Sequence, residues 1–285
     1  MVDNSKYVVL GIDIGGTNTV YGFIDEYGYV QYFDEIPTKG ALAISNFINR
    51  LDSKIKKFFE KRFDLKLIGI GIGAPNGNHM TGFIENPPNL SWERVDIVNI
   101  FKKKYNVEVK LTNDANAAAL GEKYFGLAKK MNDFVLITLG TGLGSGIFSG
   151  GRLVYGSDGF AGEMGHMVIK KGGRECNCGN SGCLEAYVSA TGISTTIRKL
   201  AKKNPNNQFL KKVISNNKID GKLLDFEYDR GNKYALYLYQ YTGQKLGYGL
   251  AQVASILSPE AFIFYGGFSN AGHRLLIPAK KSMEM

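Results

Sequence analysis

The chain has 285 residues, of which 44% are apolar, and a formal net charge of +9. This length is enough to bury a substantial core and predicts two domains. The sequence has no run of 18 apolar residues, so no membrane-spanning helix is expected. Its first residues lack the basic start and small-residue cleavage site of a signal peptide. Together with cysteines suited to metal binding, this predicts a cytoplasmic protein.

The excess positive charge is spread along the chain. Lysines occur singly or in short runs within stretches of helical periodicity, as at Lys56-Lys57 and Lys202-Lys203. They are not interleaved with stacking aromatic residues, so a solvated surface is expected rather than a nucleic-acid interface. Part of the excess is expected to attract polyanionic substrates such as nucleotides.

The first third of the chain alternates between strands and helices. Residues 6–14 form a nearly continuous apolar run, which predicts a strand buried on both faces. Apolar residues in the next long segment recur with the period of an amphipathic helix. The predicted strands cover residues 6–14, 19–25, 29–36, 65–73 and 107–112, and the predicted helices cover residues 41–62 and 95–105.

A helix is then expected to begin at Asn113 or Asp114, because an alanine-rich run follows. Residues 133–150 repeat the strand–turn–strand layout of the N-terminus, which indicates a duplicated nucleotide-binding half. Residues 191–257 are predicted to be mostly helical, and residues 261–267 begin as a strand. The expected division is an N-terminal α/β domain over residues 1–112 and a larger α/β domain over residues 113–285.

The three cysteines of the chain lie close together and are preceded by a histidine. His166, Cys176, Cys178 and Cys183 follow the order H-x9-C-x-C-x4-C. Three thiolates and one imidazole complete a tetrahedral structural Zn²⁺ site with no position for water. A chance cluster, or a redox pair with a spare thiol, is the alternative. The nearby carboxylates of Glu163 and Glu185 predict a rigid loop that binds a hydroxyl-rich ligand.

Two glycine-rich loops follow predicted strands. Residues 13–18 read DIGGTN, and residues 139–146 read LGTGLGSG. Glycines allow backbone N–H groups to approach a phosphate, and Asp13 could hold Mg²⁺ through water. No Gly-Lys-Ser/Thr follows, so neither is a Walker loop. Each alone could be an ordinary hairpin turn, but two such loops together indicate a phosphate clamp.

Asp114 has two possible roles. It could cap the helix that begins there, or it could be the base that accepts a proton from a substrate hydroxyl. Residues 82–92 form a turn-rich segment in which Asn89 could bind a pair of sugar hydroxyls. Trp92, the only tryptophan, is expected to anchor this segment to the core.

These motifs resemble those of the ROK family, which contains sugar kinases and transcriptional repressors. The matching segments are DIGGTN, GAPNG, PNLSW, NDANAAALGE, LGTGLGSGI, EMGH, CNCGNSGCLE and YGGFSNAG, in the family's order from about residue 8 to residue 272. The resemblance implies an α/β, two-domain actin-like ATPase (ribonuclease-H-like) fold with a central cleft. It also implies ATP-dependent phosphorylation of a hexose at its 6-hydroxyl, as in glucokinases.

The resemblance further implies site residues, ligands and assembly. Asp114 would be the general base, and His166 would serve the zinc with one ring nitrogen and the sugar with the other. ATP and Mg²⁺ would be required, Zn²⁺ would be structural, and a homodimer or homotetramer without nucleic-acid or membrane partners is expected. The implied sugar-binding residues are Gly73, Asn89, Asn113, Asp114, Glu163, His166 and Glu185. The implied nucleotide-binding residues are Asp13, Gly15, Gly16, Thr17, Thr141, Gly142, Gly266 and Gly267.

The chain departs from the family pattern at its two ends. Family repressors carry a helix-turn-helix domain ahead of the first glycine loop, and this loop begins at residue 13, which favours the kinase branch. Family members usually continue beyond the helix that starts near Gly272 with a further strand and helix, and the sequence stops at Met285. A catalytically weak sugar-binding or regulatory member is therefore the alternative. The choice among glucose, mannose, N-acetylhexosamines and allose depends on a few pocket contacts that the sequence does not specify.

Overall fold

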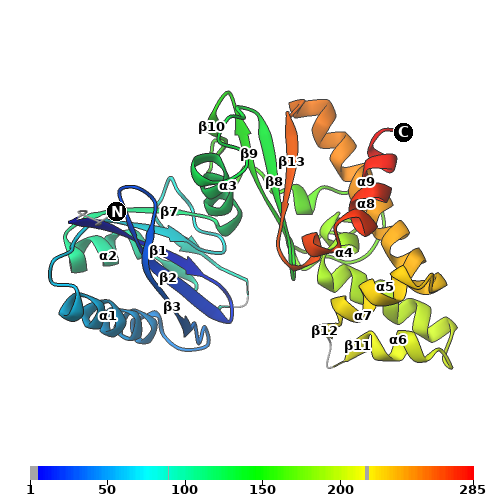
Figure 1. The fold of residues 1–285 in the computed structure, drawn as a ribbon, viewed down its shortest axis with the longest axis horizontal. Coiled ribbons are helices and arrows are strands. Elements are labelled where there is room, and N and C mark those ends of the chain that lie inside the picture. Colours follow the sequence, from blue (N-terminus) through cyan, green and yellow to red (C-terminus); the bar gives the residue numbers. More distant parts are fainter. Residues whose placement is uncertain (1–5, 89, 216–217) are drawn as a thin grey trace. The chain divides into compact units, whose positions relative to one another are not determined.

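A computed structural model describes residues 6–88, 90–215 and 218–285 of the chain as a mixed α/β protein (Figure 1). It divides into two compact units. The N-terminal unit comprises residues 1–129 and 155–161, and the C-terminal unit comprises residues 130–154 and 162–285. The division differs from the expected boundary at residue 113. The helix after that position packs on a strand of the N-terminal sheet and so belongs to the first unit.

The N-terminal unit is built on a five-stranded sheet in the order β3-β2-β1-β4-β7. The first three strands along the chain pair antiparallel, whereas β4 and β7 are parallel to β1. The strands of this sheet are β1 (Tyr7–Ile14), β2 (Asn18–Asp25), β3 (Val30–Pro37), β4 (Lys66–Gly73) and β7 (Glu108–Thr112). A separate short pair is formed by β5 (Ile84–Glu85) and β6 (Arg94–Val95). The helices are α1 (Ile44–Lys61), α2 (Ile97–Tyr105) and α3 (Asp114–Phe125).

The core of this unit lies on one face of the sheet. Alternate residues of β1, from Val8 to Ile14, are fully buried, and the ring of Phe23 on β2 stacks at 3.8 Å on Phe58 of α1. The alternate residues of β1 on the other face are not buried: Tyr7 is 47% exposed and Val9 is 38% exposed. The prediction that β1 is buried on both faces is therefore wrong. On this second face, Gly11 and Asp13 border an apolar cavity of about 750 Å³.

The C-terminal unit has a four-stranded sheet in the order β10-β9-β8-β13 and a helical part. As in the first unit, a central strand pairs antiparallel with the next strand and parallel with a later one. The strands of this sheet are β8 (Phe134–Leu139), β9 (Leu143–Ser149), β10 (Arg152–Leu153) and β13 (Ala261–Tyr265). A separate antiparallel pair is formed by β11 (Ile214–Ser215) and β12 (Lys218–Ile219). The helices are α4 (Glu185–Val188), α5 (Ala190–Lys203), α6 (Gln208–Lys212), α7 (Gly221–Asp229), α8 (Lys233–Leu257) and α9 (His273–Met283), with the 3₁₀ turns η1 (Met164–His166) and η2 (Gly267–Ala271).

Helix α8 is the centre of the C-terminal core. Its glycines bring the backbone of α9 very close, because a Cβ atom at Gly247 would lie 2.1 Å from the carbonyl oxygen of Ala279. On another part of α8, Gly249 leaves room for Leu184, the residue just before α4. Among the described residues, no helix has both the length and the apolar character needed to cross a membrane.

Candidate active site

In the N-terminal unit, the carboxyl ends of three parallel strands meet. Asp13 on β1 pairs in register with Gly73 on β4, which in turn pairs with Thr112 at the end of β7. A Cβ atom at Gly73 would lie 3.8 Å from both Oδ1 of Asp13 and Cα of Asp114. The same Cβ atom would lie only 3.1 Å from Cβ of Ala117, so the lack of a side chain at Gly73 lets α3 pack closely on β4. Asp13 and Asp114 are thereby brought to the carboxyl-end edge of the sheet, where α/β proteins bind ligands.

Helix α3 begins at Asp114, and Asn113 is its cap. The Oδ1 atom of Asn113 accepts a hydrogen bond of 2.7 Å from the backbone N–H of Asn116. Asp114 is the first residue of the helix and is exposed, and its Oδ1 accepts a bond of 2.8 Å from the adjacent N–H of Ala115. The capping role that was one alternative for Asp114 therefore belongs to Asn113.

Asp13 and Asp114 are electrostatically coupled. Partial burial of the Asp13 carboxyl raises its pKa, and the negative charge of Asp114 raises it further. A carboxylate whose ionised form is disfavoured by a second negative charge beside it is a natural position for a cation.

The first glycine loop is a tight hairpin between β1 and β2. The N–H of Gly15 donates to the carbonyl of Asn18 at 3.0 Å, and a Cβ atom at Gly15 would lie only 2.7 Å from that oxygen. Thr38 stabilises the turn with two hydrogen bonds of 2.7 Å. Its hydroxyl donates to the carbonyl of Gly15, and its backbone N–H donates to the carbonyl of Thr17. Gly16 and Thr17 are left exposed at the tip.

The second glycine loop, between β8 and β9, is fastened to the start of α5. The carbonyl of Gly140 accepts from the N–H of Ala190 at 2.9 Å, and the carbonyl of Thr141 accepts from the hydroxyl of Thr191 at 3.1 Å. Gly266 borders the same loop, with a φ of +102° and its Cβ position 2.5 Å from the carbonyl oxygen of Leu139. The loop thus lies against the turn that leads from Gly266 into η2.

Glu185 connects this loop to the cysteine-rich segment. Its Oε2 atom accepts a 2.8 Å hydrogen bond from the N–H of Leu143, and its Oε1 atom lies 3.9 Å from Sγ of Cys176. A Cβ atom at Gly142 would lie 2.5 Å from Oε2 of Glu185. Only glycine at position 142 therefore fits beside this carboxylate without a shift.

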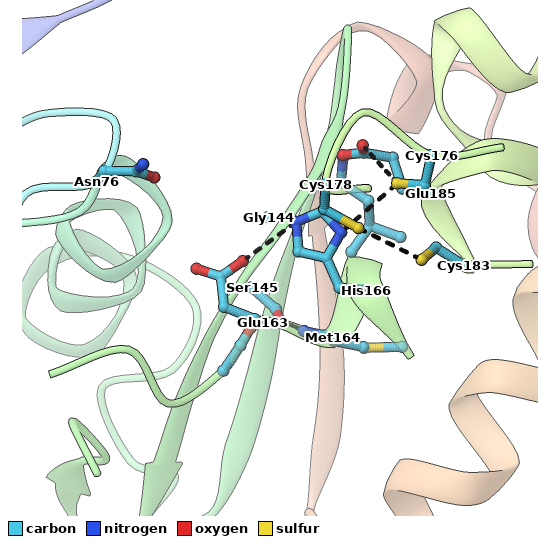
Figure 2. A network of polar contacts seen from close by, with 12 residues as sticks. Asn76, Gly144, Ser145, Glu163, Met164, His166, Cys176, Cys178, Cys183 and Glu185 are labelled. Atoms are coloured by element: carbon cyan, nitrogen blue, oxygen red, sulfur yellow. Dashed lines mark hydrogen bonds and ion pairs between the residues drawn. The ribbon is translucent and has the colours of Figure 1, made fainter. Parts of the chain in front are cut away.

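The histidine and the three cysteines form one cluster in the C-terminal unit (Figure 2). The ligand atoms of His166, Cys176, Cys178 and Cys183 all lie within 4.8 Å of one another. The Nδ1 atom of His166 is 3.7 Å from Sγ of Cys176, and the Sγ atoms of Cys178 and Cys183 are also 3.7 Å apart. The cluster thus brings together all four residues that the sequence pattern indicated.

The geometry of the cluster fits a tetrahedral zinc ion. Ligand atoms about 2.3 Å from a central Zn²⁺ are separated by about 3.8 Å, close to both distances above. Burial raises the pKa of Cys183 to about 12, so this thiol stays protonated at neutral pH unless a metal ion binds the sulfur and displaces the proton to solvent. In the loop, Gly179 and Gly182 have φ values of +88° and +86°, which L side chains rarely adopt.

The second ring nitrogen of His166 faces a carboxylate. Its Nε2 atom lies 3.8 Å from Oε2 of Glu163, as drawn in Figure 2. The backbone beside Glu163 is held by Ser145 on β9, whose hydroxyl donates to the carbonyl of Gly162 and accepts from the N–H of Met164. The ring of His166 therefore lies between the cysteine cluster and Glu163, with Nδ1 toward Cys176 and Nε2 toward Glu163.

Arg174 is a structural residue of the site that the sequence analysis missed. Its guanidinium donates to the carbonyls of Ala186 and Gly192 at 2.9 and 2.8 Å and to the hydroxyl of Thr196 at 2.9 Å. These bonds tie the loop ahead of Cys176 to α4 and α5. The sequence could not predict this role, because the hydrogen-bond partners of Arg174 lie 12 to 22 positions further along the chain and no local pattern connects them to it.

Two expectations concern the turn-rich segment 82–92. Trp92 anchors it as predicted, being 5% exposed and donating from Nε1 to the carbonyl of Leu42 at 3.0 Å. Asn89, an expected sugar ligand, lies outside the described residues.

Comparison with known proteins decides the family. The family model of the ROK family matches residues 9–284. The chain belongs to the ROK family. A glucokinase of Halalkalibacterium halodurans is 36% identical over 281 residues, covering 96% of this chain and 84% of that protein. A xylose repressor of Caldicellulosiruptor bescii is 34% identical over 260 residues, covering 90% of this chain and 64% of the repressor.

Solved structures of ROK proteins share the fold. The structure of a ROK family glucokinase from Streptomyces griseus in complex with glucose and AMPPNP matches with a TM-score of 0.79 and 31% identity, covering 96% of this chain and 88% of that one. The ROK chain described here therefore has the two-domain actin-like ATPase fold, as expected.

Proposed function

We propose that this ROK protein is an ATP-dependent hexose kinase of the glucokinase type. The observation that carries the proposal is the exposed carboxylate of Asp114. Asp114 follows the end of β7, its Cα and the carboxylate of Asp13 both lie near Gly73, and it is free of the capping role that Asn113 performs. A general base in phosphoryl transfer must be accessible to the substrate hydroxyl in this way.

The proposed reaction needs little covalent chemistry from the protein. Asp114 accepts the proton of the sugar 6-hydroxyl while that oxygen attacks the γ-phosphorus of ATP, and ADP leaves. Asp13 would hold Mg²⁺ through water, and the ion would offset negative charge on the phosphates. Backbone N–H groups of both glycine loops would bind the phosphate oxygens, through Gly15, Gly16, Thr17, Thr141 and Gly142, with Gly266 and Gly267 beside the adenosine.

Sugar recognition is assigned to the residues that the family resemblance implies. Glu163, Glu185 and Nε2 of His166 would accept or donate hydrogen bonds with sugar hydroxyls, together with Asn113, Asn89 and the backbone at Gly73. His166, Cys176, Cys178 and Cys183 would hold a structural Zn²⁺ that keeps the two glutamates in place. The glucokinase names of the relatives, and the glucose and AMPPNP of the Streptomyces griseus structure, support this assignment.

A coupled ADP-release assay tests the proposal. The zinc-loaded protein would be supplied with ATP and Mg²⁺ and, in turn, with glucose, mannose, N-acetylmannosamine and allose. ADP release that depends on one of these sugars is the expected result, with glucose preferred. A folded, zinc-loaded protein that releases no ADP with any sugar would overturn the kinase proposal.

A sugar-binding regulator is the second candidate. It is supported by the 34% identity, over 260 residues, to a xylose repressor. Such a protein would bind a sugar without turnover, so the assay above separates the two functions when it is paired with a measurement of sugar binding.

A further inference from the structure

A second cavity lies in the C-terminal unit, beside the loop of residues 167–184 that carries the three cysteines (the zinc loop). Its volume is about 370 Å³. Residues 170–174 form one wall, and two helices, α5 and α8, contribute the others. None of its lining residues has a role in the proposed kinase reaction, so its chemistry calls for a separate explanation.

The cavity is strongly basic. Lys170, Lys199 and Lys203 line it together with Arg174, and no Asp or Glu is among its described lining residues. Lys199 and Lys203 are four positions apart on α5 and therefore lie on one face of the helix, where like charges repel. A negatively charged ligand would relieve this repulsion.

The charge of these lysines is not neutralised by the protein. Lys170, Lys199 and Lys203 form no ion pair with an acidic residue in the described part of the chain. Arg174 differs, because its guanidinium is bound by two carbonyls and a hydroxyl. The arginine therefore builds the wall, and the lysine ammonium groups remain for a ligand.

The opposite wall is aromatic. Tyr237 and Tyr241 are four positions apart on α8, and their rings stack with centroids 5.8 Å apart and an interplanar angle of 17°. The Tyr241 hydroxyl is protonated at neutral pH and can donate a hydrogen bond, and burial raises its pKa further above the ordinary value. Lys245, one turn further along α8, lies 5.6 Å from the centre of the Tyr241 ring. The aromatic rings offer a flat surface for a ligand ring, and the lysines beside them attract negative charge, so the cavity suits a ligand that has both.

We propose that this cavity is a binding site for a small phosphate monoester that carries a sugar ring. Its phosphate would bind between Lys170, Lys199 and Lys203, and its ring would lie against Tyr237 and Tyr241. The product of the reaction proposed above is a molecule of this class, which is the one point that rests on the proposed function.

The cavity is connected directly to the zinc loop. The backbone N–H of Arg174 donates to the hydroxyl of Tyr187 at 3.0 Å, and its guanidinium lies 4.6 Å from the centre of that ring. Tyr187 follows Glu185 by two residues in α4, and Arg174 precedes Cys176 by two. A ligand in the cavity therefore contacts the residues that hold the ends of the zinc loop.

Isothermal titration of the intact, zinc-loaded protein with glucose 6-phosphate tests the site. Excess glucose in the cell keeps the proposed sugar site occupied, and ATP is omitted. The wild-type protein is expected to bind, and the Lys199→Glu/Lys203→Glu variant is expected to bind about tenfold more weakly or worse. The matched control is Lys211→Glu/Lys212→Glu on α6, which changes the net charge equally and should bind like the wild type.

Absence of binding to the wild type, or equal affinity of the wild type and the Lys199→Glu/Lys203→Glu variant, would overturn the proposal. Equal weakening in the control would do the same, because it would show a general charge effect. A Tyr237→Ala variant tests the ring contact: it should weaken glucose 6-phosphate but not inorganic phosphate, and unchanged binding of both would exclude the tyrosine wall. None of these results depends on turnover, so failure of the kinase proposal would be seen separately.

Discussion

Two adjacent residues, Asn113 and Asp114, divide two tasks between them. Asn113 satisfies the N–H of Asn116 at the start of α3, and it is 9% exposed. Asp114 occupies the first helical position, where the positive end of the helix dipole favours a carboxylate. Because the cap is supplied by its neighbour, a change at Asp114 removes a carboxylate without removing the cap.

The variant Asp114→Asn is therefore expected to remain folded and to lose catalysis. Loss of a general base should lower kcat by about 10²–10⁴-fold, whereas sugar affinity should stay nearly unchanged. ADP release measures the first effect and calorimetric sugar titration the second. Asp64→Asn, an exposed carboxylate paired with Arg62, is a control for the loss of one surface charge. Substantial turnover by Asp114→Asn would show that another group is the base.

Single residues also mark the limit of what the sequence could predict at the site. The pattern of His166 and the three cysteines is local, so spacing alone indicated a cluster that the structure brings together. The contact between Glu185 and the N–H of Leu143 joins residues 42 positions apart. Such a contact depends on how two loops pack, and no local pattern encodes it.

Among the elements, the zinc loop stands out because both of its ends are fastened. Arg174 binds α4 and α5 near its start, and Leu184 packs against Gly249 of α8 at its end. Within the loop, backbone hydrogen bonds close the turns, such as those from the N–H of Cys176 to the carbonyl of Asn180 at 2.8 Å and from the N–H of Gly182 to the carbonyl of Arg174 at 2.7 Å. Because the side chain of Cys178 is exposed, a metal ion is expected to fix its position and that of Cys176.

Removal of one ligand tests that dependence. Cys178→Ser should release zinc, loosen Glu163 and Glu185 together, and weaken sugar binding by about tenfold or more. Metal content by elemental analysis and sugar affinity by titration would be measured on the same sample. Ser181→Ala, an exposed change within the loop, should keep both. A Cys178→Ser protein that has lost zinc but binds sugar normally would refute the coupling.

The elements that the sequence predicted are those with long, regular patterns. The apolar run before the first glycine loop and the amphipathic α1 were expected near their observed bounds, and the mostly helical character of residues 191–257 was expected as well. Two-residue strands such as β10 and the single turn α4 were not, because they are too short to show a period. The open face of β1 was missed for another reason: an apolar run does not show which face neighbouring elements cover.

At the scale of the whole molecule, two cores of similar strand connectivity make up the chain. The N-terminal core gathers residues between Val8 and Leu111, and the C-terminal core gathers residues between Val135 and Ala279. Each unit carries one glycine loop at the turn of its first hairpin. The similarity supports the expected duplication, although the boundary lies after Lys129 rather than at residue 113.

This arrangement predicts how ligands affect stability. A kinase must bind both sugar and nucleotide, so glucose alone and AMPPNP with Mg²⁺ alone should each raise the melting temperature. At a ligand concentration of 100 Kd the stabilisation is about 2.7 kcal/mol. For units of this size that corresponds to a shift of roughly 5–10 °C. Differential scanning fluorimetry measures both shifts.

The same experiment separates binding from chemistry. Asp114→Asn should largely keep both shifts, because the amide oxygen of asparagine can still accept a hydrogen bond from the sugar hydroxyl but cannot take its proton. A shift with sugar but none with AMPPNP would contradict the kinase proposal and favour the sugar-binding regulator, whose task requires no nucleotide. If Asp114→Asn kept both shifts and still released ADP, the residues would bind as proposed but another group would be the base.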